Sequence, residues 1–112
     1  MSALLVLTNL PDRDSATAMA TALVERGLAA CVNSLGACRS TYRWDGRIES
    51  AEEFPLLIKT TTERYPALEA AVSELHPYDV PELVAVEITT GLPAYLGWLA
   101  ECCKPASDQE TT

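Results

Sequence analysis

Asp45-Gly46 divides two long stretches of residues that favour β-strands. Asp-Gly is typical of the two-residue type I′ turn, because both central positions of that turn have positive φ. Leu28–Trp44, before the dipeptide, is rich in β-branched, aromatic and small residues, and its Gly36 marks a bulge or bend. Arg47–Thr60, after the dipeptide, continues as a strand. The pattern predicts a long antiparallel hairpin.

The hairpin is too long for the globule that this chain can form. Fully extended, Arg47–Thr60 spans about 46 Å, whereas a compact chain of 112 residues has a diameter of roughly 34 Å. Two arrangements remain open. Bulges at Gly36 and around Pro55 could fold the hairpin back onto the body, or the hairpin could project and leave its backbone edges for strands of another chain.

Residues near the turn favour the projecting arrangement. Tyr42 and Trp44 lie close to the tip, where a single domain would expose both aromatic rings to water. Large aromatic side chains at such positions are typically buried against a neighbouring chain. We therefore expect an oligomer with Tyr42, Trp44 and Ile48 in its interface.

The other elements follow from periodicity and from the signals that begin and end helices and strands. They are a buried strand Ala3–Leu10, a helix Ser15–Arg26 closed by Gly27, a helix that begins at one of Thr60, Thr61 or Thr62 and ends at His76, a strand Glu82–Thr89 and a helix Ala94–Cys103. This βαββαβ order with an added C-terminal helix predicts a ferredoxin-like α+β fold, with helices on one face of a four-stranded antiparallel sheet. We expect one domain over residues 1–103 and a disordered tail over residues 104–112.

The acidic composition limits the partners that the chain can bind. With a net charge of −8, the protein should repel nucleic-acid phosphates and anionic lipids. No apolar run approaches the roughly 20 residues that a membrane-spanning helix needs. The sequence starts with a short apolar run that no basic residue precedes, unlike a secretory signal. We expect a cytoplasmic protein without a nucleic-acid or membrane partner.

The four cysteines could form disulfides or hold a metal, but their spacing argues against both. Cys31 and Cys38 fall in one predicted strand, on opposite faces and roughly 23 Å apart unless a bulge brings them closer. Cys102 and Cys103 are neighbours on a predicted helix, and neither begins a Cys-x-x-Cys pair. We expect buried, reduced thiols.

Five segments, in the same order along the chain, carry a family resemblance. They are Gly27–Asn33, Tyr42–Ile48, Leu57–Thr61, His76–Leu83 and Tyr95–Trp98. Together they resemble the CutA family of divalent-cation tolerance proteins. The resemblance implies a ferredoxin-like fold assembled as a tight homotrimer through the long hairpins. It also implies a link to tolerance of copper and other divalent cations, and a trimer similar in architecture to PII signalling proteins.

His76 is the only histidine and the first candidate for a cation ligand, because neutral imidazole suits copper and zinc. The alternative, which we slightly favour, is a histidine that ends a helix and hydrogen-bonds nearby carbonyls. Family members proposed to bind copper carry tandem histidines before Pro-Tyr and a cysteine at the end of the first strand, where this chain has Leu75-His76 and Thr8. His76 with Glu82 would make a weak, exchangeable site for Cu²⁺ or another divalent cation, unless three subunits contribute ligands. No obligatory cofactor is expected.

The resemblance also places a ligand cleft between subunits. Its positions correspond to Lys59, Trp44, Tyr78 and Trp98. An ammonium among aromatic rings could hold the carboxylate or phosphate of a small effector, as a PII-like sensor or scaffold would. Alternatively, Lys59 pairs across an interface with Glu82 or Glu49, which we favour because an unpaired buried charge is costly. The two tryptophans are interpreted as packing residues.

Enzymatic readings find little support in the residues. A histidine-dependent hydrolase would have to use His76 as its base, with Cys31 as a conceivable nucleophile. The loop after the first strand reads Asn9–Asp12, which has neither the glycine-rich phosphate loop of acylphosphatases nor the Cys-x-x-Cys of metal chaperones. No nucleotide-binding glycine motif is present. A non-enzymatic cation-tolerance protein is the preferred hypothesis.

Overall fold

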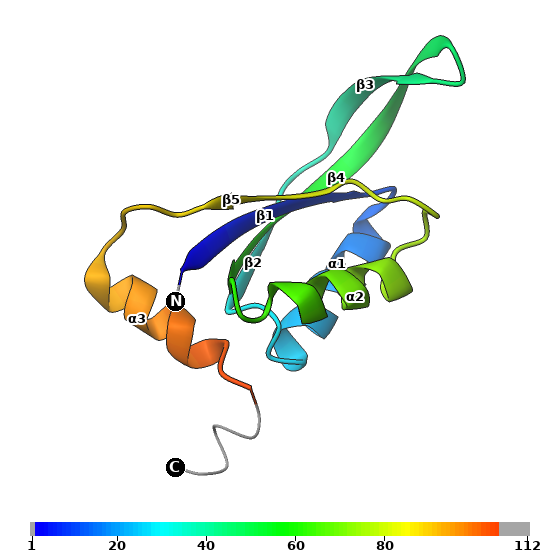
Figure 1. The fold of residues 1–112 in the computed structure, drawn as a ribbon. Coiled ribbons are helices and arrows are strands. Elements are labelled where there is room, and N and C mark those ends of the chain that lie inside the picture. The colour runs from blue at the N-terminus through cyan, green and yellow to red at the C-terminus, as the bar shows by residue number, and fades with distance from the viewer. Residues whose placement is uncertain (1, 106–112) are drawn as a thin grey trace.

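A computed structural model describes residues 2–105, which form one antiparallel sheet with helices packed against it. In chain order the elements are β1 (Ala3–Leu10), α1 (Arg13–Glu25), β2 (Cys31–Ser34), β3 (Cys38–Trp44), β4 (Arg47–Thr61), α2 (Tyr65–Leu75), β5 (Leu83–Glu87) and α3 (Pro93–Cys102). Strands β2, β4, β1 and β5 are neighbours in that order, and β3 pairs with β4 alone (Figure 1). This topology confirms the predicted ferredoxin-like α+β fold, with its long hairpin and added C-terminal helix. Within residues 2–105, no helix combines the length and apolar character needed to cross a membrane.

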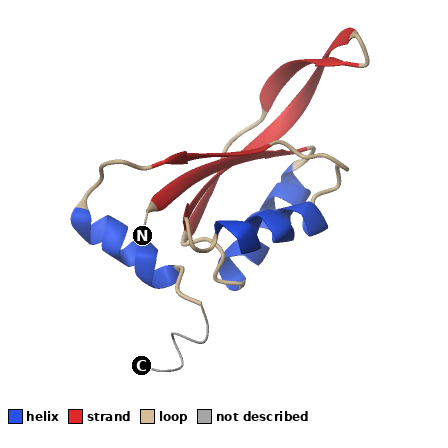
Figure 2. Cartoon of the chain, viewed as in Figure 1, coloured by secondary structure: helices blue, strands red, loops and turns tan. Residues whose placement is uncertain are grey.

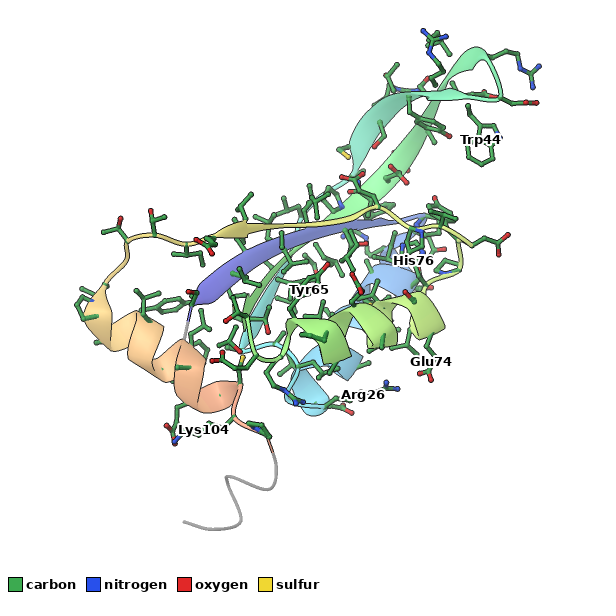
Figure 3. The ribbon with its side chains drawn as sticks, in the orientation of Figure 1. Arg26, Trp44, Tyr65, Glu74, His76 and Lys104 are labelled. Atoms are coloured by element: carbon green, nitrogen blue, oxygen red, sulfur yellow. The ribbon has the colours of Figure 1, made fainter. Side chains whose placement is uncertain are left out.

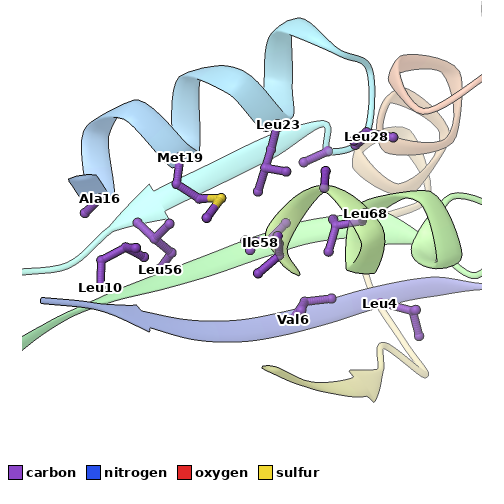
Figure 4. Close-up of a cluster of buried hydrophobic side chains, with 13 residues drawn as sticks. Leu4, Val6, Leu10, Ala16, Met19, Leu23, Leu28, Leu56, Ile58 and Leu68 are labelled. Carbon is purple, nitrogen blue, oxygen red and sulfur yellow. The ribbon is translucent and has the colours of Figure 1, made fainter. Parts of the chain in front are cut away.

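The hydrophobic core lies between the sheet and the helices α1 and α2, which cover the same face (Figures 1 and 2). Alternate residues of the central strands point into it, so that Val6, Leu56 and Ile58 are fully buried against Leu23 and Leu68 from the helices (Figure 4). Alternate residues of β4 therefore face the core where that strand crosses the body.

Helix α1 ends at the predicted glycine, but it begins at Arg13, two residues before the predicted start. The Asp12 carboxylate accepts a hydrogen bond from the Ser15 backbone N–H at 2.7 Å, which caps the first turn. Gly27 has a φ of 69°, the left-handed conformation that closes a helix. Because of that turn, the N–H of Leu28 reaches back to the carbonyl of Leu23 at 3.0 Å.

The β3–β4 hairpin, called the ribbon below, projects from the body as predicted (Figures 1 and 2). Strand β4 has 15 residues, and the molecule measures 52 × 28 × 23 Å along its principal axes. At the tip, Asp45 has a φ of 51° and Gly46 a φ of 76°, as a type I′ turn requires. The alternative in which bulges fold the hairpin back onto the body is therefore wrong. The strand is interrupted between β2 and β3, near Gly36, but the ribbon still projects.

That interruption splits the predicted strand Leu28–Trp44 into β2 and β3. Pro55 lies opposite the gap, where its carbonyl accepts from the Leu35 N–H at 2.9 Å. Backbone N–H and C=O groups of one residue point the same way in an antiparallel strand. Pro55 has no N–H to return a bond toward Leu35, so the break in pairing between β2 and β3 falls where β4 lacks a donor.

Several predicted boundaries need correction. Helix α2 begins at Tyr65. Of the threonines expected to cap it, Thr60 and Thr61 end β4 and Thr62 lies in the turn that follows. Thr61 Oγ1 accepts from the Arg64 N–H at 3.3 Å, so that a short turn separates strand and helix. Strand β5 (Leu83–Glu87) is shorter than the predicted Glu82–Thr89. The predicted disorder concerns mainly residues 106–112, which lie outside the described residues.

Candidate functional site

His76 ends α2, and both of its ring nitrogens are engaged within the chain. Its side chain lies in the body of the molecule and the residue is only 7% exposed (Figure 3). Nε2 donates to the backbone carbonyl of Asn9 at 2.7 Å, and Nδ1 accepts from the Tyr78 N–H at 3.1 Å. One nitrogen must carry a proton and the other a lone pair, so this pattern fits the neutral imidazole protonated at Nε2.

Glu82, the second predicted metal ligand, is bound to the same end of β1. Its Oε1 accepts from the Asn9 side-chain amide at 2.9 Å, and its backbone carbonyl accepts from Thr8 Oγ1 at 2.7 Å. Asn9 therefore bridges His76 and Glu82 through its carbonyl and its side chain. These contacts fasten the segment between α2 and β5 to the end of the first strand.

The single chain does not supply a fitted metal site from these residues. A Zn²⁺ or Cu²⁺ site needs an imidazole lone pair, and Nδ1 of His76 already accepts from Tyr78. Among residues 2–105, no group of three or more His, Cys, Asp or Glu residues is placed to hold a metal ion. The metal role of His76 and Glu82 therefore stays a prediction, and it requires rearrangement or ligands from other copies of the chain.

Tyr78 stacks on His76 and reaches the base of the ribbon. The two ring centroids are 4.8 Å apart at an interplanar angle of 47°. The Tyr78 hydroxyl donates to Glu53 Oε2 at 3.2 Å. Burial, followed by the neighbouring Glu53 carboxylate, raises the pKa of the Tyr78 phenol, so that the hydroxyl keeps its proton and remains a donor.

Lys59 lies on the face of the sheet opposite α1 and α2. In the strand register it is opposite Leu5 on β1 and Cys31 on β2. Its Nζ donates to Asn33 Oδ1, a neutral partner within the chain. The pairing expected across an interface with Glu82 or Glu49 stays a prediction. Within residues 2–105, no carboxylate forms an ion pair with Lys59.

The predicted interface residues occupy the tip of the ribbon. Trp44 is 67% and Ile48 65% exposed, and Tyr42 is exposed as well (Figure 3). Trp44 is opposite Arg47, and β4 runs about 40 Å from Arg47 to Lys59. Trp44 and Lys59 of one chain therefore cannot line one cleft, and only a second copy could bring these positions together.

Trp98 lies on α3 rather than beside Tyr78. It is half exposed and packs against Tyr95, with 5.5 Å between ring centroids. The Tyr95 hydroxyl approaches Cys31, and burial first, then this thiol, raise the pKa of the Tyr95 phenol. A hollow of about 400 Å³ lies between α3 and the adjoining ends of β1 and β5, with Glu87 on its wall. None of the predicted site residues lines this hollow.

All four cysteines are free thiols, but the predictions of burial and of opposite faces need correction. Cys103 is buried, whereas Cys38 is exposed. Cys31 is opposite Lys59 and Cys38 is opposite Glu53, so that both share one face of β4. An extra residue in the gap between β2 and β3 reverses the parity of β3. The two thiols remain about 20 Å apart along the strand.

Sequence reasoning missed several residues that contact the predicted site residues or the base of the ribbon. The Arg13 guanidinium lies 5.3 Å from the centre of the Phe54 ring. Glu53, Asn9 and Asn33 also bind predicted site residues without having been singled out. The strand register was the missing signal, because it brings Leu10 of β1 opposite Phe54 and so places the start of α1 beside the ribbon.

Comparison with known proteins agrees with this architecture. A family model described as "CutA1 divalent ion tolerance protein" matches residues 4–102. The chain is 48% identical over 96 residues to the divalent-cation tolerance protein CutA of Thermus thermophilus, covering 86% of this chain and 93% of that protein. It is 39% identical over 101 residues to mouse protein CutA, covering 90% of this chain and 57% of that protein.

Solved structures extend the comparison to three dimensions. The Thermus thermophilus Cut A1 structure has a TM-score of 0.90 at 45% identity and covers 91% of this chain and 99% of that one. The CutA structure from Xylella fastidiosa has a TM-score of 0.90 at 40% identity and covers 93% and 100%. The projecting ribbon, the sheet order and the matched sequence lead to one conclusion: the chain belongs to the CutA1 divalent ion tolerance protein family.

Proposed function

We propose that the protein acts in divalent-cation tolerance as a homotrimer and catalyses no reaction. Membership of the CutA1 family supports the cation-tolerance role. The ribbon carries the proposal of assembly, because β3 pairs with β4 alone and leaves an unpaired backbone edge beside exposed Trp44 and Ile48. Unpaired edges with apolar side chains are the usual sites for strands of another chain.

The opposite border of the sheet provides a matching surface. Within residues 2–105, strand β5 pairs with β1 on one side only, and its Val84 and Val86 are more than half exposed. Both valines lie on the face without α1 and α2, next to half-buried Leu5 and Leu7 of β1. The open face of an antiparallel sheet is normally polar. Two different apolar surfaces on one chain suit a heterologous contact, which closes into a ring when copies are related by rotation.

Charge substitutions test the assembly. Ile48→Asp on the ribbon and Val86→Asp on the open face should each convert the trimer to smaller species, because an aspartate cannot be buried in an apolar interface without a partner. Val80→Asp is the matched control, since Val80 is 89% exposed on the segment between α2 and β5. If both interface variants keep the mass of the unsubstituted protein in light scattering, these surfaces are not the interface.

The absence of catalysis is supported by the state of the only histidine. A cysteine or serine nucleophile needs a base with a free lone pair close to it. His76 is buried, its Nε2 donates to a backbone carbonyl, and its Nδ1 accepts from a backbone N–H. A broad screen for hydrolase activity is expected to give the same rates for the protein and for His76→Ala; a rate lost with His76 would overturn this part of the proposal.

In this proposal the protein binds Cu²⁺ weakly and exchangeably. It can also contribute to cation tolerance indirectly, through a partner. The support is the donor set, because one chain offers a single, already engaged imidazole with carboxylates such as Glu82. Calorimetric titration with Cu²⁺ should give micromolar or weaker binding that His76→Ala reduces. Identical binding in the protein and in a folded His76→Ala variant would remove His76 from the site.

A second candidate function rests on Lys59. Its ammonium has a neutral partner within the described chain, so its charge is available to an acid from another copy or to a small anion. A PII-like sensor would use this lysine to bind the carboxylate or phosphate of an effector between subunits. A thermal-shift screen of nucleotides and organic acids tests it, since a ligand at 100 times its dissociation constant stabilises by about 2.7 kcal/mol. The shift should vanish in Lys59→Met and persist in Lys104→Met; no shift with any compound excludes this candidate.

The proposal includes a cytoplasmic location without nucleic-acid or membrane partners. Four free thiols suit a reducing compartment, and a net charge of −8 opposes binding to phosphate backbones. Cell fractionation checks the location: recovery with cytoplasmic markers is expected, and recovery with envelope markers would contradict it.

A further inference from the structure

We infer that the angle of the ribbon is set by a two-sided brace at its base, in which Tyr78 holds Glu53 and Arg13 holds Phe54. The inference deepens the proposed homotrimer, because the ribbon is the part that must reach another copy of the chain. It assigns a positioning role to His76, which fixes the backbone of Tyr78.

The ribbon has a natural pivot where it leaves the body. The last pair between β4 and β1 is Phe54 with Leu10, and the last pair between β4 and β2 is Leu56 with Ser34. The pairs with β3 begin only at Glu53. Around Phe54 and Pro55, one edge of β4 therefore faces the gap between β2 and β3. There the Leu35 N–H donates to the Pro55 carbonyl. Strand segments with few lateral bonds are the parts of a sheet that open most readily.

Tyr78 holds one face of the pivot. Its hydroxyl donates to Glu53 Oε2 at 3.2 Å, from a segment that is distant in sequence. A hydrogen bond to a carboxylate is stronger than one between neutral groups. Glu53 is the residue of β4 at which the ribbon begins. The contact therefore links the base of the ribbon to the segment between α2 and β5.

Arg13 holds the other face. Its guanidinium lies 5.3 Å from the centre of the Phe54 ring, within the range of a cation–π interaction. Successive residues of a strand point to opposite faces. Glu53 and Phe54 are consecutive, so contacts from Tyr78 and Arg13 restrain the pivot from both sides of the sheet.

Tyr78 can act as a brace because its own position is fixed. His76 Nδ1 accepts from the Tyr78 N–H, the two rings pack 4.8 Å apart, and His76 Nε2 is tied to the carbonyl of Asn9. Glu82 fastens the far end of the same segment to Thr8 and Asn9. The brace is thereby anchored in β1, the central strand next to the pivot.

The brace matters for assembly because a ribbon that swings is less often in the geometry that a neighbour accepts. Apparent affinity falls in proportion to the fraction of chains in the competent conformation. A trimer uses three ribbons. A decrease in the fraction of ribbons in the competent conformation therefore lowers the formation constant of the trimer by about the third power of that decrease. Weakening the brace should therefore lower trimer stability more than a comparable change elsewhere.

Hydrogen–deuterium exchange of the full chain tests the brace directly. Tyr78→Phe removes only the hydroxyl, and Arg13→Gln replaces the cation by a shorter, neutral amide. Tyr65→Phe is a matched control, because the Tyr65 hydroxyl also donates to a glutamate, Glu69, at 3.2 Å, but within α2 (Figure 3). Peptides that cover residues 52–56 should exchange about five-fold faster or more in Tyr78→Phe, and faster still in the double variant. The control should leave these peptides unchanged.

The outcome separates the brace from the assembly. If Tyr78→Phe and Arg13→Gln leave exchange at residues 52–56 equal to that of Tyr65→Phe, the brace is overturned even when the protein is a trimer. If exchange rises as expected in a protein that light scattering finds to be monomeric, the brace stands and the proposed trimer fails. Dilution of the trimer provides the second measurement: Tyr78→Phe should dissociate at a higher protein concentration than Tyr65→Phe, and equal midpoints would contradict the inference.

Discussion

His76 Nε2 donates to the carbonyl of Asn9 across 67 positions of sequence, at 2.7 Å. This bond joins the end of α2 to the end of β1, at the point where the ribbon leaves the body. Together with the bond from the Tyr78 N–H to Nδ1, it makes the only histidine a structural link between helix, sheet and ribbon.

Replacing His76 should cost stability. His76→Ala leaves the Asn9 carbonyl and the Tyr78 N–H without partners in a site that is 7% exposed, and each unsatisfied group costs about 1–3 kcal/mol. The free energy of unfolding from urea titration, at fixed protein concentration, measures the loss. His76→Asn should recover part of it, because its Oδ1 can replace Nδ1 as the acceptor. Equal stability of His76→Ala and the unsubstituted protein would contradict the structural role.

Thr60 offers a second test of a buried hydrogen bond. The Thr60 hydroxyl is fully buried and donates to the Leu28 carbonyl at 2.7 Å, which fixes the turn after α1 to β4. Thr60→Val keeps the shape and leaves this carbonyl unpaired, so we expect a loss of about 1–2 kcal/mol in the free energy of unfolding. Thr17→Val, at an exposed position of α1, serves as the control. A loss no greater than that of the control would show that water replaces the bond.

The stability of the protein should decline at high pH through Tyr78. Burial and the nearby Glu53 carboxylate raise the pKa of its phenol above the ordinary 10.0. A group with a raised folded-state pKa stabilises the fold fully below its unfolded pKa, and this contribution is lost as pH rises through the folded value. Between pH 9 and 12, about the range in which tyrosines ionise, Tyr78→Phe should flatten the decline in unfolding free energy. An unchanged slope would mean that the phenol does not contribute.

Cys103 should be the least reactive of the four thiols. It is buried, and burial raises the pKa of its thiol above the ordinary 9.0, so that little reactive thiolate forms near neutral pH. Titration with a thiol reagent at neutral pH should give the same native-state count for the protein and for Cys103→Ala. After unfolding, the protein should react with one more equivalent than the variant. A drop in the native count of Cys103→Ala would contradict the buried, protonated state.

The ribbon and the order of the elements could be predicted because each depends on local signals. Gly27 and Asp45 adopt the positive φ that their positions in the sequence indicated. The extent of β4 follows from the turn at Asp45-Gly46 and from apolar residues of one parity, Ile48, Phe54, Leu56 and Ile58. A strand of this length exceeds the body whatever the details of packing. The parity of β3 could not be predicted, since a single extra residue near Gly36 reverses it.

The candidate site was less predictable than the fold. Its residue types suggested metal or anion chemistry for His76 and Lys59, but their partners are a backbone carbonyl and a side-chain amide. A backbone carbonyl at Asn9 has no signature in the sequence, because every residue carries one. The Arg13–Phe54 contact depends on which residue of β4 is opposite the end of β1, and that register emerges only from the folded sheet.

Sedimentation or light scattering of the unsubstituted protein in dilute solution tests the central claim most directly. The account predicts a mass three times that of the 12.1 kDa chain, since the ribbon and the open face of β5 both need neighbours. A stable species of 12.1 kDa would contradict it, because the exposed Trp44, Ile48 and Val86 would then face water in the working protein.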